Sequence, residues 1–253
     1  MPVSLKELLS CTNTLLKPEV FNDYCPNGLQ VQGSDTIQTL VAGVTASQAL
    51  IDRAIAANAD ALLVHHGFFW KGEDPCVVGI KYRRLQALLD HNINLIAYHL
   101  PLDAHPVMGN NAQLANLLGL TVTGGLEPHN PNSVGNVGRL AAAMPAADFC
   151  QQVAKALGRE PLLIQSGDHP IETIGWCTGA AQGYIDQAAM QGVDAYLSGE
   201  VSEPTVHSAR ELGVHYIAAG HHATERYGVQ AVGEYLAAEF KLDYQFIDID
   251  NPV

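Results

Sequence analysis

The sequence predicts an α/β protein built from two related lobes, each with a mostly parallel sheet. Strand-like apolar runs alternate with amphipathic helical runs. One part of the chain repeats another, and histidine and carboxylate motifs follow strand-like runs at equivalent points of that repeat. Since ligands of α/β sheets collect at the carboxyl ends of parallel strands, the sequence also predicts a metal site at those ends, between the lobes.

Length and charge limit the classes of protein and partner. The chain has 253 residues, 47% of them hydrophobic, which is ample for a sizeable core. With 13 Lys and Arg against 26 Asp and Glu, the net charge of −13 disfavours duplex nucleic acid and membrane surfaces as partners. Single-stranded nucleic acid and a small anionic substrate stay open, because a bound metal can reverse the local charge.

The five cysteines indicate no disulfide framework. They are odd in number, widely spaced and never in a C-x-x-C pair, so no thiolate zinc site is indicated either. The first ten residues, MPVSLKELLS, lack the basic and apolar regions of a secretion signal, and no apolar run is long enough to span a membrane. We therefore expect a soluble, cytoplasmic protein.

The first half of the chain alternates helical and strand-like segments. Ser4 and Glu7 form a capping-box signature, and the helical spacing that follows ends at Pro18. After the turn-rich YCPNGLQVQG, strands are predicted at 39–45, 60–66 and 94–99, and helices at 47–59 and 81–92. Such alternation is typical of βαβ units.

An internal repeat relates the two halves. Residues 37–67 align without a gap to residues 171–201, and ten of the thirty-one positions are identical. Further on, LIAYHLPLD matches IAAGHHATE, so the spacing of His99 and Asp103 recurs as His221 and Glu225. This repeat predicts two lobes of the same architecture.

A stretch rich in glycine, asparagine and proline, residues 123–138, separates the halves. We place the boundary near its start, with a first lobe over 1–125 and a second over 126–253. The C-terminal part either stays in the second lobe or returns to the first. Residues 138–167 are expected to form a strand, a helix from about Pro145 and a strand, and YQFIDID a strand that closes one sheet.

Three strand-like runs are followed at once by residues of the metal-ligand type: ALLV by His65 and His66, NLIAY by His99 and Asp103, and YIAAG by His221, His222 and Glu225. Adjacent strand residues point to opposite faces, so His65 and His66 can serve one site only if the strand has ended. On a helix, His221 and Glu225 would share a face. Pro101 favours a loop for His99 and Asp103.

The number of candidate ligands indicates two metal ions. Three or four imidazoles and two carboxylates exceed what one open tetrahedral zinc needs, whereas a pair of bridged ions would use them all. Nitrogen and oxygen donors suit Zn, Mn, Fe, Co or Ni, and the sequence does not choose among these metals. Such a site activates water for hydrolysis.

Structural roles compete with the metal hypothesis. A lone histidine at a strand end is more often a hydrogen-bonded structural residue, and it is the placement at equivalent points of the repeat that favours metal. Glu200, at the repeat position of His66, faces the site or caps a helix. Two interpretations of FFWKGE stay open: Lys71 and Glu73 reach a substrate, or Phe68, Phe69 and Trp70 simply cap the core. The other histidines are expected in loops or on surfaces: His91, His105, His129, His169, His207 and His215.

The motifs NGLQV, HHGFFWKGE, HLPLDAHPVMGNN and GHHATE resemble the dinuclear-metal-centre family of GTP cyclohydrolase I type-two homologues, also called the Ngg-interacting-factor-three-like family. The resemblance covers nearly the whole chain and is closest to the short bacterial members. It implies a ring-shaped homohexamer with the metal sites facing an inner cavity. By motif it also implies five metal ligands, with His99 a further histidine of the pocket: His65, His66, Asp103, His221 and Glu225.

The sequence therefore predicts a metal-dependent hydrolase with two divalent ions that acts on a small phosphorylated or nucleotide-like molecule. Asp103 would bridge the ions and His99 would shuttle a proton. GTP ring opening itself is not predicted, because the enzyme evoked by the family name binds zinc with cysteines and no cysteine lies near the histidine motifs in the sequence. The alternative is a non-catalytic protein that stores or senses metal, or an assembly scaffold.

Overall fold

In a computed structural model, which describes residues 2–253, the chain forms two compact units. Unit 1 comprises the chain up to Leu102 and Gly228–Asp250, and unit 2 comprises Asp103–Tyr227 and Asn251–Val253. Both units pair a β-sheet with helices, which confirms the predicted α/β class. Within residues 2–253, no helix combines the length and apolarity that crossing a membrane requires.

The sheet of unit 1 has five strands in the order β13-β4-β5-β6-β2. Its first four strands pair in parallel, as predicted, and only β2 pairs antiparallel, at the edge beside β6. A small antiparallel pair, β1 and β3, lies outside this sheet. The strands are β1 (Val3–Ser4), β2 (Gly28–Val31), β3 (Thr36–Ile37), β4 (Thr39–Thr45), β5 (Ala61–His66), β6 (Asn94–Ala97) and β13 (Asp243–Phe246).

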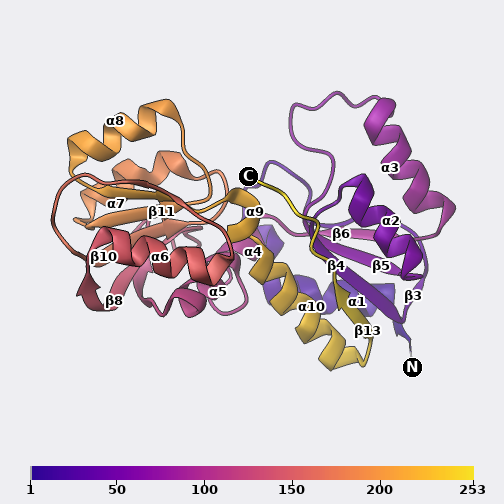
Figure 1. The fold of residues 1–253 in the computed structure, drawn as a ribbon. Helices are drawn as coiled ribbons and strands as arrows, with labels where there is room; N and C mark the ends of the chain where they lie inside the picture. The colour runs from indigo at the N-terminus through magenta and orange to yellow at the C-terminus, as the bar shows by residue number, and fades with distance from the viewer. Residues whose placement is uncertain (1) are drawn as a thin grey trace. The chain divides into compact units, whose positions relative to one another are not determined.

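Helices cover both faces of this sheet. Figure 1 shows α2 and α3 on one face, with α1 and α10 on the other. The α2 and α3 face is closed by apolar contacts of Leu50 and Leu88 with strand residues such as Leu62. The predicted capping box holds the start of α1, where Ser4 accepts from the Glu7 N–H and the Glu7 carboxylate accepts from the Ser4 N–H. The helices are α1 (Leu5–Leu16), the 3₁₀ turn η1 (Pro18–Val20), α2 (Gln48–Ala56), α3 (Gly79–Asp90) and α10 (Arg226–Phe240).

The sheet of unit 2 has six strands in the order β7-β8-β10-β11-β12-β9. The central β10, β11 and β12 are parallel, whereas β7, β8 and β9 pair antiparallel. Antiparallel neighbours need only a short connection, and residues 126–135 supply one between β7 and β8. The strands are β7 (Thr121–Gly125), β8 (Asn136–Met144), β9 (Leu162–Ile164), β10 (Ile171–Cys177), β11 (Ala195–Ser198) and β12 (His215–Ala218).

Unit 2 is also covered on both faces. Leu114 of α5 and Phe149 of α6 pack with Trp176 in one apolar cluster, and Ile185 of α7 and Ala209 of α8 pack in another. The helices are α5 (Asn110–Leu118), α6 (Ala146–Leu157), the 3₁₀ turn η2 (Gln182–Tyr184), α7 (Ile185–Met190), α8 (Glu203–Leu212) and α9 (His221–Thr224). The short helix α4 (Leu100–Ala104) contains the boundary between the units.

The order of elements extends the repeat well beyond the aligned residues. Along the first half run α1, β2, β4, α2, β5, α3, β6, α4, α5 and β7; along the second run α6, β9, β10, α7, β11, α8, β12, α9, α10 and β13. The pairing repeats as well, because β2 is antiparallel to β6 as β9 is to β12. Apart from β1, β3, β8 and the two 3₁₀ turns, the two halves therefore have the same order of helices and strands.

The compact units nevertheless differ from the halves of this repeat. The sequence predicted lobes over 1–125 and 126–253, whereas residues 103–125 belong to unit 2 and residues 228–250 belong to unit 1. In Figure 1 the yellow β13 lies beside β4, with which it pairs in parallel. Each half thus gives its last strand, and most of the helix before it, to the unit formed mainly by the other half.

Two aspartates at equivalent positions of the repeat, Asp60 and Asp194, accept hydrogen bonds from backbone at the starts of β4 and β10. Asp60 accepts from the backbone N–H groups of Gln38 and Thr39, at 2.8 and 2.9 Å. Asp194 accepts from the N–H groups of Glu172 and Thr173, at 3.0 and 2.8 Å, and from the Thr173 hydroxyl. Burial raises the pKa of Asp194, but these donors outweigh it and hold the pKa below its ordinary value.

His215 corrects one prediction. It was expected in a loop or on the surface, but it is fully buried at the start of β12. Its Nδ1 accepts from the Ser166 N–H at 3.1 Å and its Nε2 donates to the His169 carbonyl at 2.9 Å. Because both ring nitrogens have protein partners, burial of this imidazole needs no metal.

Removing the Asp194 carboxylate should destabilise unit 2 by about 1–3 kcal/mol, because two backbone N–H groups lose their acceptor. Thermal unfolding of Asp194→Ala, beside Asp186→Ala as an exposed control on α7, measures this effect. Equal melting temperatures for the two variants would show that the hydrogen bonds of Asp194 do not stabilise unit 2.

Candidate metal centre

Three imidazoles gather in unit 1. His65 and His66 end β5, and His99 follows β6. Their ligand atoms all lie within 4.8 Å of one another. The expectation that the strand must end before both adjacent histidines can serve one site was wrong, since β5 extends through His66 and the two rings still lie 4.4 Å apart. Side chains in a strand lean along the chain, so neighbours at its end can converge.

Hydrogen bonds fix which nitrogen each ring presents. His65 Nδ1 donates to the Tyr98 carbonyl at 3.0 Å, and His99 Nδ1 donates to the Asp23 carboxylate at 2.9 Å. His66 Nδ1 lies 3.1 Å from the Thr45 hydroxyl. A neutral imidazole whose Nδ1 carries the hydrogen presents the lone pair of Nε2, which is the arrangement of metal-binding histidines.

Asp23 is a functional candidate that the sequence analysis did not identify. Its side chain is buried, and its second oxygen accepts from the Asn27 amide at 2.9 Å and the Leu100 N–H at 3.0 Å. Burial raises the pKa of Asp23, but hydrogen bonds and the charge of His99 outweigh it and lower the pKa to about 2. The carboxylate is therefore ionised at neutral pH, and it orients His99.

Cys25 lies closer to this cluster than the sequence indicated. One ligand atom each from Asp23, Cys25 and His99 lies within 4.8 Å of the others, and the Cys25 thiol is 3.8 Å from Asp23. Cys25 is far from the histidine motifs in the sequence, but the turn after Asp23 brings residues 25 and 99 together in space.

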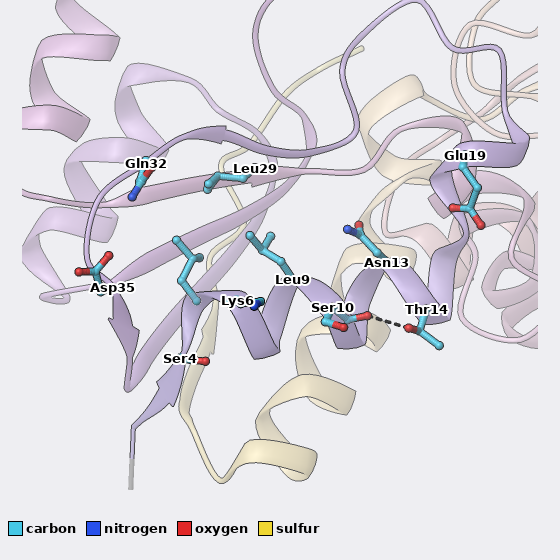
Figure 2. Close-up of a pocket in the computed structure, with 11 residues that line it drawn as sticks. Ser4, Lys6, Leu9, Ser10, Asn13, Thr14, Glu19, Leu29, Gln32 and Asp35 are labelled. Carbon is cyan, nitrogen blue, oxygen red and sulfur yellow. Dashed lines mark hydrogen bonds between the residues drawn. The ribbon is translucent and has the colours of Figure 1, made fainter.

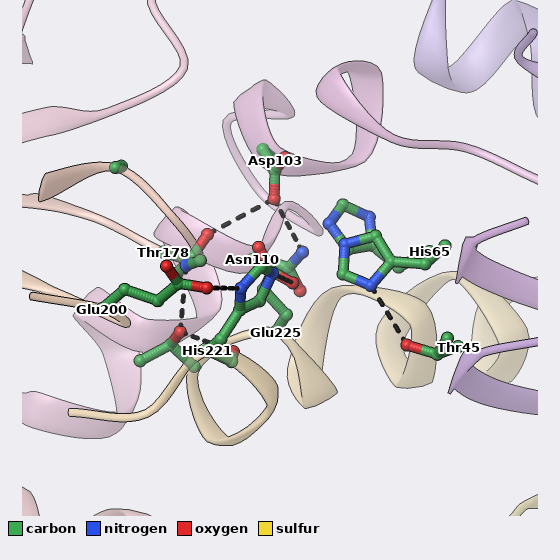
Figure 3. A network of polar contacts seen from close by, with 12 residues as sticks. Thr45, His65, Asp103, Asn110, Thr178, Glu200, His221 and Glu225 are labelled. Atoms are coloured by element: carbon green, nitrogen blue, oxygen red, sulfur yellow. Dashed lines mark hydrogen bonds and ion pairs between the residues drawn. The ribbon is translucent and has the colours of Figure 1, made fainter. Parts of the chain in front are cut away.

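In unit 2, two amide groups and a hydroxyl hold Asp103. Its Oδ1 accepts from Asn110 Nδ2 at 2.8 Å and from Thr178 Oγ1 at 3.3 Å, as Figure 3 shows. The Asn111 side chain links the same two residues, because its oxygen accepts from the Thr178 N–H and its amide donates to the Asp103 carbonyl. Asp103 was expected in a loop, but it lies in α4, where Pro101 sits at the helix start that proline tolerates.

His221 and Glu225 lie together in unit 2, as their spacing predicted. His221 Nε2 is 3.0 Å from Glu225 Oε2, and Glu200 Oε1 is 2.7 Å from His221 Nδ1. One detail differs, because the helix breaks at Glu225, which separates α9 from α10. Glu200 thus takes the role that Asp23 has for His99, because its carboxylate holds Nδ1, while Nε2 of His221 faces Glu225 (Figure 3).

Negative charge dominates this part of unit 2. Asp103 and Glu225 are 5% and 3% exposed. Burial, and then the charges of Asp103 and Glu225, raise the pKa of the Cys177 thiol well above its ordinary value. Burial lowers the pKa of His221, but hydrogen bonds and charges of Glu225 and Glu200 outweigh it and raise the pKa to about 9. Buried carboxylates of this kind require positive charge, which a proton on His221 or a cation supplies.

The donors fit divalent metal. Unit 1 offers three imidazoles, two of them held by carbonyl or carboxylate oxygens, and unit 2 offers an imidazole and two buried carboxylates. Nitrogen and oxygen donors with such hydrogen-bonded supports suit Zn, Mn, Fe, Co or Ni. The five predicted ligands, His65, His66, Asp103, His221 and Glu225, are all buried or half-buried.

His222, which follows the predicted ligand His221, has a backbone role. Its N–H donates to the Val253 carbonyl at 2.9 Å. A hollow of about 840 Å³ along α1 contains none of the predicted ligands, so it is not the metal site (Figure 2). It is lined by Ser4, Leu5, Lys6, Leu9, Ser10, Asn13, Thr14, Glu19, Leu29, Gln32 and Asp35.

The supporting residues were the main omission of the sequence analysis. Asp23 and Thr178 have no motif of their own, and Asn110 lies in the motif HLPLDAHPVMGNN but was not singled out there. Only the spacing of Asp23 and Asn27 in a turn-rich stretch gives a further local signal. Glu200 could be suspected because it occupies the repeat position of His66.

Fold and donors together define a class: two-unit α/β proteins with clustered histidines and carboxylates of the metal-ligand type. Within that class, the chain belongs to the Duf34/NIF3 (NGG1p interacting factor 3) family, whose profile matches residues 3–252. It is 60% identical over 252 residues to a Pseudomonas aeruginosa protein named GTP cyclohydrolase 1 type 2 homolog, with all of both chains covered.

Solved structures agree with this assignment. One described as protein ybgI of unknown function has a TM-score of 0.95 and 50% identity, covering 99% of this chain and 100% of its own. A crystal structure of a Thermus thermophilus protein has a TM-score of 0.91 and 32% identity, covering 99% of this chain and 100% of its own. The predicted family resemblance is confirmed.

Gly179→Ala should reduce metal binding. A Cβ at this position would lie 2.0 Å from Glu225 Oε1, so the carboxylate must move. Gly192→Ala is the matched control, since Gly192 has a similar positive φ of 73° but no atom within 4 Å of the added Cβ. Both variants should lose about 1–2 kcal/mol through backbone strain. Elemental analysis should find metal lost only from Gly179→Ala, and equal metal contents would contradict the placement of Glu225.

The stability of metal-free protein should depend on the charge of His221. Its pKa is raised from 6.5 to about 9, so the stabilisation from the protonated ring is complete below about pH 6.5 and is lost as the pH rises through about 9. In chelator, the melting temperature of the natural chain should therefore exceed that of His221→Asn at low pH. This difference should shrink as the pH rises from about 6.5 to about 9. A constant difference would indicate that Glu200 and Glu225 do not raise this pKa.

Proposed function

We propose that the chain is a metal-dependent hydrolase with two divalent ions, acting on a small phosphorylated or nucleotide-like molecule. The observation that carries the proposal is the set of histidines whose Nδ1 is held by an oxygen: His65 by Tyr98, His99 by Asp23 and His221 by Glu200. The proposed metal ligands are His65, His66, Asp103, His221 and Glu225. The name of the Pseudomonas aeruginosa relative, which contains GTP cyclohydrolase, supports a nucleotide-like substrate.

Bound divalent ions would lower the pKa of water and polarise the bond to be cleaved. The chain's own residues then bind, orient and move protons. Asn110 and Thr178 both donate to Oδ1 of Asp103 and so set the orientation of the carboxylate. Glu200 keeps the hydrogen of His221 on Nδ1. These supports set the direction of each ligand before the metal arrives.

His99 is the proposed proton shuttle. Asp23 accepts the hydrogen of its Nδ1, which leaves Nε2 to take a proton from water and return it to the leaving group. The ionised Asp23 also stabilises the imidazolium that forms in between. His99 is 7% exposed, so few water molecules compete for that proton.

Asp103→Ala should hold fewer than two ions per chain and lose activity by about 10²-fold or more, because a ligand is removed. His99→Gln should keep both ions and lose about 10²-fold in kcat, since only proton transfer is affected. Elemental analysis and turnover of phosphate esters, nucleotides and cyclic nucleotides by protein loaded with each metal measure both effects. Glu203→Ala, a variant of an exposed carboxylate on α8, is the control.

Two outcomes would contradict the proposal. Two ions retained by Asp103→Ala would remove Asp103 from the ligand set. Absence of turnover with every metal and substrate would favour the alternative, a non-catalytic metal-binding or scaffold protein with a coordinatively closed site.

A further inference from the structure

Two aromatic side chains flank His99 in unit 1. The Tyr24 and His99 rings have centroids 4.9 Å apart and meet at 71°, and the Trp70 and His99 rings are 5.1 Å apart at 89°. Tyr24 and Trp70 touch each other, with centroids 5.9 Å apart and planes 35° apart. Trp70 also lies 5.9 Å from His66. The two aromatics therefore form a continuous wall beside the histidine cluster.

This wall is open to solvent. Tyr24 is 52% exposed and Trp70 is half-buried, while the neighbouring Phe68 is 6% exposed and packs in the core of unit 1. From the sequence, only a core-capping role was considered for Phe68, Phe69 and Trp70, and of Phe68 and Trp70 the structure gives that role to Phe68 alone. Phe68 caps the core, so the exposed faces of Tyr24 and Trp70 need a different explanation.

The backbone around the wall is held in place. The Lys71 N–H donates to the Tyr24 carbonyl at 2.7 Å, and the Phe68 N–H donates to the Gln30 side chain at 2.6 Å. Between them, Phe69 adopts a φ of 67°, a left-handed conformation that is uncommon for a large side chain. Strain of this kind persists where the surrounding structure imposes it, which is frequent at ligand sites. Here it brings Trp70 against Tyr24 and His99.

We infer that Tyr24 and Trp70 form a stacking platform for a flat heteroaromatic ring, such as a nucleobase, that is part of the substrate. The inference rests on the proposed function, because it assigns the substrate of the same site. A centroid separation of 5.9 Å leaves no room for a ring between the two aromatics, so the ligand ring stacks on their exposed faces. Stacking suits any base, since every base has a π face.

The position of the platform links recognition to chemistry. His66 is a proposed metal ligand and His99 the proposed proton shuttle, and Trp70 contacts both rings. A ring stacked on the wall is thus held next to the reacting groups, and its phosphate or sugar substituents can extend to the metal. Substrates that lack such a ring lose this positioning, which should lower kcat/KM rather than metal binding.

Binding to metal-free protein tests the platform apart from catalysis. The chain has two tryptophans, and Trp176 is fully buried in unit 2, so a change in fluorescence on ligand addition reports Trp70. Adenosine and guanosine 5′-monophosphate in chelator should quench this emission, and ribose 5-phosphate should not. Tyr24→Ala should weaken nucleotide binding roughly tenfold, measured by calorimetry, whereas Tyr24→Phe, which keeps the ring, should bind within about twofold of the natural chain.

Tyr82→Ala is the matched control, because Tyr82 is a similarly exposed tyrosine, 48%, on α3 of the same unit. Ribose 5-phosphate binding as tightly as the nucleotides, or equal affinities in Tyr24→Ala and Tyr82→Ala, would overturn the platform. Hydrolysis of non-aromatic phosphate esters at the rate of nucleotides would also overturn it and leave the proposed hydrolase intact. Nucleotide binding that depends on Tyr24, without turnover by any metal-loaded form, would overturn the hydrolase alone.

Discussion

The candidate centre depends on one constraint: a buried imidazole presents a lone pair in a fixed direction only when its other nitrogen is hydrogen-bonded. His65 and His99 satisfy it through the Tyr98 carbonyl and the Asp23 carboxylate. At the half-buried His221, Glu200 holds Nδ1 in the same way, while Nε2 faces Glu225. These hydrogen bonds offset part of the cost of burying the rings before any metal binds. Asp23 also accepts from the Leu100 N–H, which ties the residue just past His99 to the same carboxylate.

One scaffold carries two different donor sets. In the first half, β5 ends in His65 and His66, and Thr45 at the end of the adjacent β4 contacts His66. At the equivalent positions, the second half has Gly199 and Glu200, and Gly179 in place of Thr45. The absent side chain of Gly179 makes room for the Glu225 carboxylate, and Glu200 contacts His221. The strand ends also differ, because β5 runs through His66, whereas β11 ends at Ser198, two residues before Glu200.

Local patterns predicted the α/β class, the capped first helix at Ser4, the repeat and the pairing of His221 with Glu225, because each depends on residues close in sequence or on strand ends. Contacts between distant residues were not predictable in this way. Asp23 reaches His99 across 76 positions, and nothing in its neighbourhood signals that partner. The burial of His215 likewise depends on Ser166 and His169 in a separate turn. Asp103 was misplaced because a proline was interpreted as ending helices rather than starting one.

The exchange of terminal segments affects the order in which the chain can fold during synthesis. Strand β4 is made early, but its partner β13 pairs residues 243–246 with residues 39–42, so one edge of the unit 1 sheet stays open until residue 246 has left the ribosome. The sheet of unit 2 needs only residues 121–218, which emerge sooner. Although it begins later in the sequence, unit 2 can complete its sheet first, and the exposed edge of β4 is the place where a nascent chain is most prone to pair wrongly.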